Sequence, residues 1–235
     1  MDVESIHNQG SYNKPMEIES KFYQTLKARH REIRDSLPQN LSLRIHRALS
    51  WLNCAEQKED NDSKFIFLWI SFNAAYAHEI LNRWEFNERQ VLSNFLQILI
   101  DADDDKSLYN IVWNEFSNSI RLLINNQYVY QQFWDFQNEK INEEEWLNLF
   151  QNSKDASNRA MGHMDTEKVL AIVFERLYTL RNQLIHGGAT WNSTINRDQI
   201  RDGTKFMNQI VPAIISIMLN KKPKLIGEPC YPVVQ

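Results

Sequence analysis

The stretch RNQLIH places three side chains capable of chemistry within six residues, namely Arg181, Asn182 and His186. A guanidinium binds oxyanions through two parallel hydrogen bonds. An imidazole, with a reference pKa of about 6.5, can take or give protons near neutral pH. Asn182 and His186 are four residues apart, so on a helix they share a face, and the amide could orient the imidazole. The three residues therefore predict a site that binds an anion and transfers protons.

A helix must carry these residues, because apolar side chains precede them at helical spacing from residue 167 to residue 186. The stripe consists of Leu170, Val173, Leu177, Leu180 and Leu184. Asp165 or Thr166 can cap the start of the helix, and Gly187 and Gly188 predict its end. His186 would then lie in the last turn, where the helix dipole favours its protonated form.

Arg181 lies beside this stripe, at about 140° from His186 around an ideal helix. The two side chains can converge if the last turn unwinds, or if two copies of the motif face each other across a dimer axis. A guanidinium beside an apolar stripe must find a partner, which could be a buried acid, a cleft or a second subunit. A simple helix cap surrounded by solvated cations remains an alternative.

Basic residues concentrate in the same part of the chain, although the whole sequence carries a net charge of −4. From Lys168 to Lys224 nine Lys and Arg residues face three acids, which gives +6. Arg197, Arg201 and Lys205 recur every four residues and so share one face of a helix predicted from residue 196 to 219. This face is expected to hold phosphate groups.

The composition predicts an all-α protein, because only six glycines and six prolines occur in 235 residues. Residues 1–16 are expected to form a flexible tail, and residues 17–235 a single helical domain in which residues 85–164 are an elaboration. Further helices are predicted over residues 16–35, 41–57, 63–84, 87–100, 106–124, 128–137 and 143–161. Neither a secretion leader nor a membrane-spanning run is present, so we expect a cytoplasmic protein without a membrane partner. Its two cysteines match no metal-ligand spacing.

The helix predicted from residue 63 to 84 is apolar nearly all round, which is typical of a helix at the centre of a domain. Asn73 and Tyr76 add polar groups to it and are candidates to support the site. The aromatic residues of the middle region are expected to be packing residues rather than a base-stacking surface.

The motif RNQLIH and the helix LWISFNAAYAHEI together resemble the HEPN superfamily, all-α proteins marked by Arg-x₄₋₆-His at a helix end, with a polar residue after the arginine. The resemblance implies a homodimer that cleaves RNA without a metal or other cofactor, leaving 2′,3′-cyclic phosphate and 5′-hydroxyl ends. Arg181 would bind the scissile phosphate, His186 would move protons, and Asn182 would position His186 or a phosphate oxygen. A toxin or antiviral defence role, with an antitoxin or regulatory protein as partner, is also implied.

One residue departs from part of that family: toxin members often carry a tyrosine two residues after the histidine, where this chain has Gly188. Two rival functions are kept. One is an inactive HEPN-like module that binds a nucleotide or a partner protein. The other is a helical scaffold in which Arg181 pairs with a buried acid such as Glu79.

Overall fold

The computed structural model describes residues 22–76, 88–194, 196–221 and 223, and within them the chain is helical and contains no strand. The predicted all-α class is therefore confirmed. The α-helices are α1 (Phe22–Ile33), α2 (Gln39–Glu56), α3 (Asn61–Tyr76), α4 (Glu88–Asp101), α5 (Ser107–Asn110), α6 (Ser117–Asn125), α7 (Gln131–Gln137), α8 (Glu143–Gly162), α9 (Thr166–Ile185) and α10 (Arg197–Lys221). Two 3₁₀ turns, η1 (Arg34–Ser36) and η3 (Gln127–Val129), and one π-helical turn, η2 (Ile111–Glu115), connect some of them.

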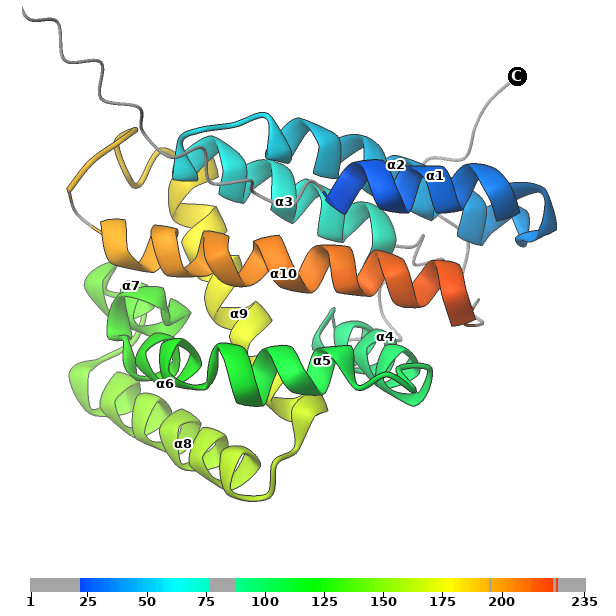
Figure 1. Ribbon diagram of the computed structural model, residues 1–235. Helices are drawn as coiled ribbons and strands as arrows, with labels where there is room; N and C mark the ends of the chain where they lie inside the picture. The colour runs from blue at the N-terminus through cyan, green and yellow to red at the C-terminus, as the bar shows by residue number, and fades with distance from the viewer. Residues whose placement is uncertain (1–21, 77–87, 195, 222, 224–235) are drawn as a thin grey trace, which may run out of the picture.

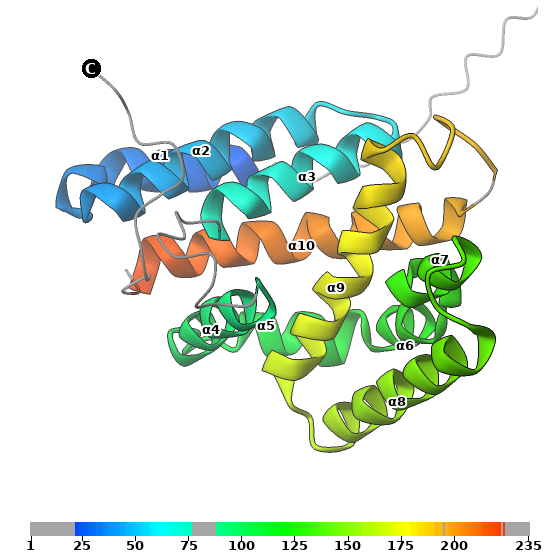
Figure 2. The same cartoon turned by 180° about the vertical axis from the view of Figure 1, so that it is seen from behind.

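The helices form two layers joined by α9 (Figure 1). Helices α1, α2, α3 and α10 lie together in one layer, and α4 to α8 form the other. Figure 2 shows α9 running steeply from the end of α8 across to α3 and α10. The helix that carries the predicted motif is thus the one that connects the two layers.

Helix α3 is central, as its apolar sequence predicts, and it packs against α2, α9 and α10. Gly203 allows α10 to approach closely, because a Cβ atom there would lie 3.0 Å from Leu177 Cδ2 and 3.3 Å from Phe65 Cε2. Helices α3, α9 and α10 therefore pack at a spacing that a larger side chain at position 203 would increase.

Some predicted helices have different bounds. Helix α2 begins at Gln39, two residues before the predicted start at residue 41. The helix predicted over residues 106–124 is divided at η2 and Phe116, where the backbone (φ −116°, ψ 9°) leaves the helical region before α6. Residues 1–16 and 77–84, which include the predicted tail and the end of the third predicted helix, lie outside the described residues.

Aromatic side chains pack the second layer, as the sequence predicts. Trp146 is buried, with its ring centroid 5.4 Å from that of Phe133 and 6.1 Å from that of Phe136. No helix among the described residues is both long and apolar enough to cross a bilayer.

Candidate functional site

Helix α9 carries the motif with nearly the bounds that the sequence predicts. Asp165 caps its start, where the carboxylate accepts a hydrogen bond of 3.2 Å from the Lys168 backbone N–H. The helix ends at Ile185, and Gly187 follows with φ +71°, a left-handed conformation that glycine adopts without strain. The predicted cap and the predicted glycine stop are both confirmed.

Arg181 is partly buried and has no carboxylate partner among the described residues. Its Nη1 donates a hydrogen bond of 2.9 Å to Asn182 Oδ1. Its Nε is buried and has no partner, and its guanidinium carbon lies 5.8 Å from the Tyr178 ring centroid. Glu79, the acid suggested as a structural partner, lies outside the described residues.

Asn182 bonds its neighbour rather than the histidine side chain. Its amide oxygen is used by Arg181, and its backbone carbonyl accepts the His186 N–H at 3.0 Å. His186 is exposed and caps the C-terminus of α9 with φ −89° and ψ 9°. The structure therefore brings Arg181 and Asn182 together and leaves the imidazole in solvent at the helix end.

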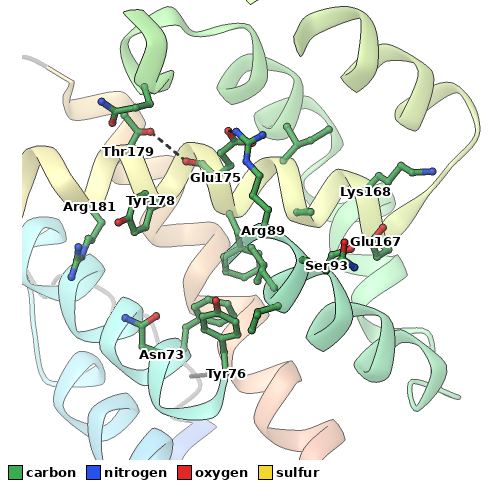
Figure 3. Close-up of a pocket in the computed structure, with 18 of the residues that line it drawn as sticks. Asn73, Tyr76, Arg89, Ser93, Glu167, Lys168, Glu175, Tyr178, Thr179 and Arg181 are labelled. Carbon is green, nitrogen blue, oxygen red and sulfur yellow. Dashed lines mark hydrogen bonds and ion pairs between the residues drawn. The ribbon is translucent and has the colours of Figure 1, made fainter. Parts of the chain in front are cut away.

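Arg181 lies at one end of a cavity of about 990 Å³ bounded by α3, α4, α7, α8 and α9 (Figure 3). Its apolar wall is aromatic: Phe72 stacks on Tyr76 at 5.4 Å and on Phe174 at 4.2 Å, with Tyr178 nearby on α9. Asn73 and Tyr76, the predicted supporting residues, line this cavity together with Arg181. Asn182 and His186 do not line it.

Acidic side chains in the cavity already have partners. Glu175 pairs with Arg89, and Glu167 accepts a hydrogen bond of 2.5 Å from the Ser93 hydroxyl. The other cations of the lining are also paired, Arg89 with Glu175 and Lys168 with Asp165. A ligand that carries negative charge would therefore find its counter-charge at Arg181.

The predicted cationic face of α10 is largely neutralised by ion pairs. Asp62 binds Arg197 through both carboxylate oxygens, at 2.8 and 3.4 Å, and Arg201 pairs with Asp198 at 2.8 Å and with Asp202 at 3.0 Å. Lys205 is exposed and has no carboxylate partner among the described residues. Phosphate binding by the two arginines, which stays a prediction, would require these ion pairs to open.

Two buried arginines were not predicted from the sequence. Arg44 donates to the carbonyls of Ala75 and Tyr76 at the end of α3, at 3.4 and 3.3 Å. Arg176 donates to Ser153 Oγ at 2.6 Å and lies 4.3 Å from the Tyr130 ring centroid. Burial lowers the pKa of Arg176 and raises that of Tyr130. Their burial could have been predicted from their position on the apolar faces of α2 and α9.

An exposed apolar face flanks the motif. Tyr178 and Ile185 are seven residues apart on α9, hence on one side of the helix, and are 44% and 46% exposed. Trp191, in the segment that follows the glycines, is 73% exposed. Arg181 and His186 lie on either side of the line through Tyr178 and Ile185.

No cluster of three or more His, Cys, Asp or Glu side chains suited to a metal ion occurs in the part of the chain that the structure describes. Comparisons with protein-family models, curated proteins and solved structures found no match.

Proposed function

We propose that this protein cleaves RNA without a metal ion, as a homodimer, using Arg181 to bind the scissile phosphate and His186 to transfer protons. The observation that supports this proposal most is the incomplete pairing of the Arg181 guanidinium. A partly buried guanidinium that has an unpartnered Nε and no carboxylate partner among the described residues favours an anion from outside the chain.

The reaction uses the substrate's own 2′-hydroxyl. The 2′-oxygen attacks phosphorus while His186 takes its proton, and the bond from phosphorus to the 5′-oxygen breaks. The His186 of a second copy protonates the departing 5′-oxygen, leaving a 2′,3′-cyclic phosphate and a 5′-hydroxyl. Arg181 stabilises the charge that develops on the phosphorane oxygens, and Asn182 acts as a positioning residue that holds Arg181.

A homodimer accounts for the separation of the two side chains. Arg181 and His186 lie about 140° apart around α9, on either side of the exposed Tyr178 and Ile185. A twofold axis through this apolar face would place the His186 of one copy opposite the Arg181 of the other. Exposed aromatic and aliphatic side chains are typical of the centre of such an interface.

Further cations and partners complete the proposal. Lys205, and Arg197 and Arg201 when their ion pairs open, would hold flanking phosphates. Cleavage of cellular RNA would require restraint by an antitoxin or regulatory protein, and toxicity on expression that is lost in His186→Ala would support this.

The test is cleavage of single-stranded RNA in EDTA by the wild type, Arg181→Ala and His186→Ala, with the product ends identified. His163→Ala is a matched control, because His163 is also an exposed histidine that caps the C-terminus of a 20-residue helix, with φ −91° and ψ 0°. Arg159→Ala on α8 is the control for Arg181, since Arg159 is exposed. Loss of one general acid–base group is expected to slow cleavage by about 100-fold or more.

The same proteins should be melted to separate catalysis from folding. Retained stability with lost cleavage in both motif variants supports the proposal. Equal cleavage by wild type and His186→Ala refutes it. Unfolding of Arg181→Ala, at a cost of about 3 kcal/mol or more, would instead favour the scaffold function.

A second candidate function is nucleotide binding without cleavage, because the aromatic cavity contains Arg181 but not His186. Aromatic side chains stack on bases, and a guanidinium pairs with phosphate. Binding of AMP, measured by isothermal titration calorimetry, that requires Arg181 but not His186, together with no cleavage of any RNA, would support this candidate.

A further inference from the structure

A second cavity, of about 440 Å³, lies where the end of α1, the turn η1 and the start of α2 meet. It is remote in sequence from the motif on α9. Its lining residues are His30, Arg34, Leu37, Gln39, Ser42, Leu43 and His46. Two imidazoles, a guanidinium, an amide and a hydroxyl thus face one small space.

Basic side chains line this cavity and flank it. Lys27 Nζ lies 3.4 Å from His46 Nδ1, and the rings of His30 and His46 are 6.2 Å apart between centroids. Burial lowers the pKa of His30, and the charges of Lys27, His46 and Arg34 lower it further. The pKa of His46 is lowered in the same way, by burial and then by Lys27, Arg47 and Arg34. Charges of one sign held this close destabilise each other unless an anion joins them.

Lys27 shows the same effect. Burial and the charges of Arg31 and Arg34 lower its pKa. Within the part of the chain that the structure describes, Arg34 pairs with one carboxylate, that of Asp35 at 3.6 Å. Their side chains are 59% and 95% exposed, so solvent screens this pair. Asp35 therefore leaves much of the positive charge of the cavity in place.

His30 is the buried member of the group, with 3% of its surface exposed. Its Nε2 lies 3.3 Å from Ser42 Oγ, and its Nδ1 is buried without a partner. The neighbouring start of α2 adds to the positive potential. Pro38 provides no side-chain cap for this 18-residue helix, and Asn40 Oδ1 accepts the Leu41 N–H at 2.7 Å. The backbone N–H groups of Gln39 and Asn40 have no acceptor among the described residues.

We propose that this cavity is a binding site for a phosphate group, held by Arg34, His46 and the start of α2. Phosphate has tetrahedral oxygens and a negative charge that match several cations and helix N–H groups at once. Arg34 donates from its guanidinium, and His46 donates once it is protonated. Lys27 supplies a further positive charge from α1. The phosphate could be free in solution or part of a nucleotide or an oligonucleotide.

The site does not depend on the proposed ribonuclease activity, since none of its residues belongs to the motif or to the α9 cavity. Binding should raise the pKa values of His30 and His46, because an anion favours their charged forms.

The experiment follows the histidine Cε1–H proton resonances of the whole protein by NMR while orthophosphate, AMP or a 2′-deoxy oligonucleotide is added at constant ionic strength. The deoxy strand carries phosphodiesters but cannot be cleaved through a 2′-hydroxyl, so a failure of the ribonuclease proposal leaves this result unaffected. Saturable binding of at least one of the three ligands, with raised pKa values for both histidines, is expected. If orthophosphate binds, free phosphate is sufficient for the site. If only AMP or the oligonucleotide binds, the ligand is a phosphate ester.

Arg34→Gln and His46→Gln should each weaken binding by about tenfold or more, because each removes a charge-assisted hydrogen bond. Arg29→Gln is the matched control: it removes the same charge from α1 at a residue that pairs with Glu32 at 3.1 Å, and it should change the affinity less than twofold. All variants are compared by thermal melting first. Absence of saturable binding by all three ligands, or binding that Arg34→Gln and His46→Gln reduce no more than Arg29→Gln does, overturns the proposal.

Discussion

The ion pair between Asp62 and Arg197 should be a main support of the segment that follows the motif. Asp62 lies in the first turn of α3, 8% exposed, and Arg197 in the first turn of α10, 26% exposed. The carboxylate also accepts the Asn192 backbone N–H at 3.2 Å. Asp62→Asn keeps the shape of the side chain and removes its charge, so it isolates the electrostatic contribution.

The expected cost follows from these contacts. Breaking a fully buried ion pair costs about 3–5 kcal/mol, but the partial exposure of Arg197 reduces this. The asparagine can still accept one hydrogen bond, while the favourable interaction with the start of α3 is lost. We therefore expect the free energy of unfolding to fall by about 2–3 kcal/mol, which lowers the melting temperature of a chain of this size by about 5–10 °C.

Urea unfolding and thermal melting measure this cost, with Asp198→Asn as the control. Asp198 is 76% exposed and pairs with Arg201, so removing the same charge there should cost less than about 0.5 kcal/mol. Asp62→Asn would also free Arg197 to bind phosphate and should raise RNA affinity above that of the control. Equal stability of the two variants would refute the assigned role of the ion pair.

Three further predictions concern stability, each measured by urea unfolding. Gly203→Val should lower the free energy of unfolding by about 2 kcal/mol or more, because its Cβ would meet Leu177 at 3.0 Å. Gly162→Ala, with open space around the added Cβ, should change stability by less than about 1 kcal/mol. Similar values for both variants would contradict the close approach of α10. Arg176→Ala should cost about 3 kcal/mol through a cavity and the lost contact with the Tyr130 ring, and a loss no larger than that of Arg159→Ala would be inconsistent with this. Burial raises the pKa of Asp165, but hydrogen bonds from the side chain and backbone of Lys168 lower it below its ordinary value. Its capping contribution, about 1 kcal/mol, is therefore present above about pH 4 and is lost as the pH falls through the native pKa. The difference in free energy of unfolding between wild type and Asp165→Ala should shrink below about pH 4. A constant difference from about pH 7 to pH 3 would oppose this assignment.

Helix α9 was predictable because its signals are local. Asp165 caps it, leucines follow at helical spacing, and Gly187 ends it, all within a short stretch of sequence. The division of the region 106–124 was not predictable, since its apolar spacing continues through the π-helical turn η2. Tertiary packing there overrides a pattern that reads as one helix.

The candidate site was only partly predictable for the same reason. Arg181 and Asn182 are adjacent, so their hydrogen bond lies within reach of sequence reasoning. The partner of Arg197 was not, because Asp62 is 135 residues away and becomes a neighbour only when α3 packs against α10. Regular spacing indicates that charges share a helix face, but it does not indicate which of them are already paired.

The sequence by itself determined the helical class, the helix that carries the motif and the positions of its ends, because backbone hydrogen bonding and side-chain periodicity act over a few residues. Only the tertiary structure decided that Arg181 opens onto an aromatic cavity while His186 stays in solvent, and that Arg44 and Arg176 are buried. It also gathered the basic groups of α1, η1 and α2 around a second cavity. These features depend on how separate helices meet, and the free energy of such contacts comes from residues far apart in the chain.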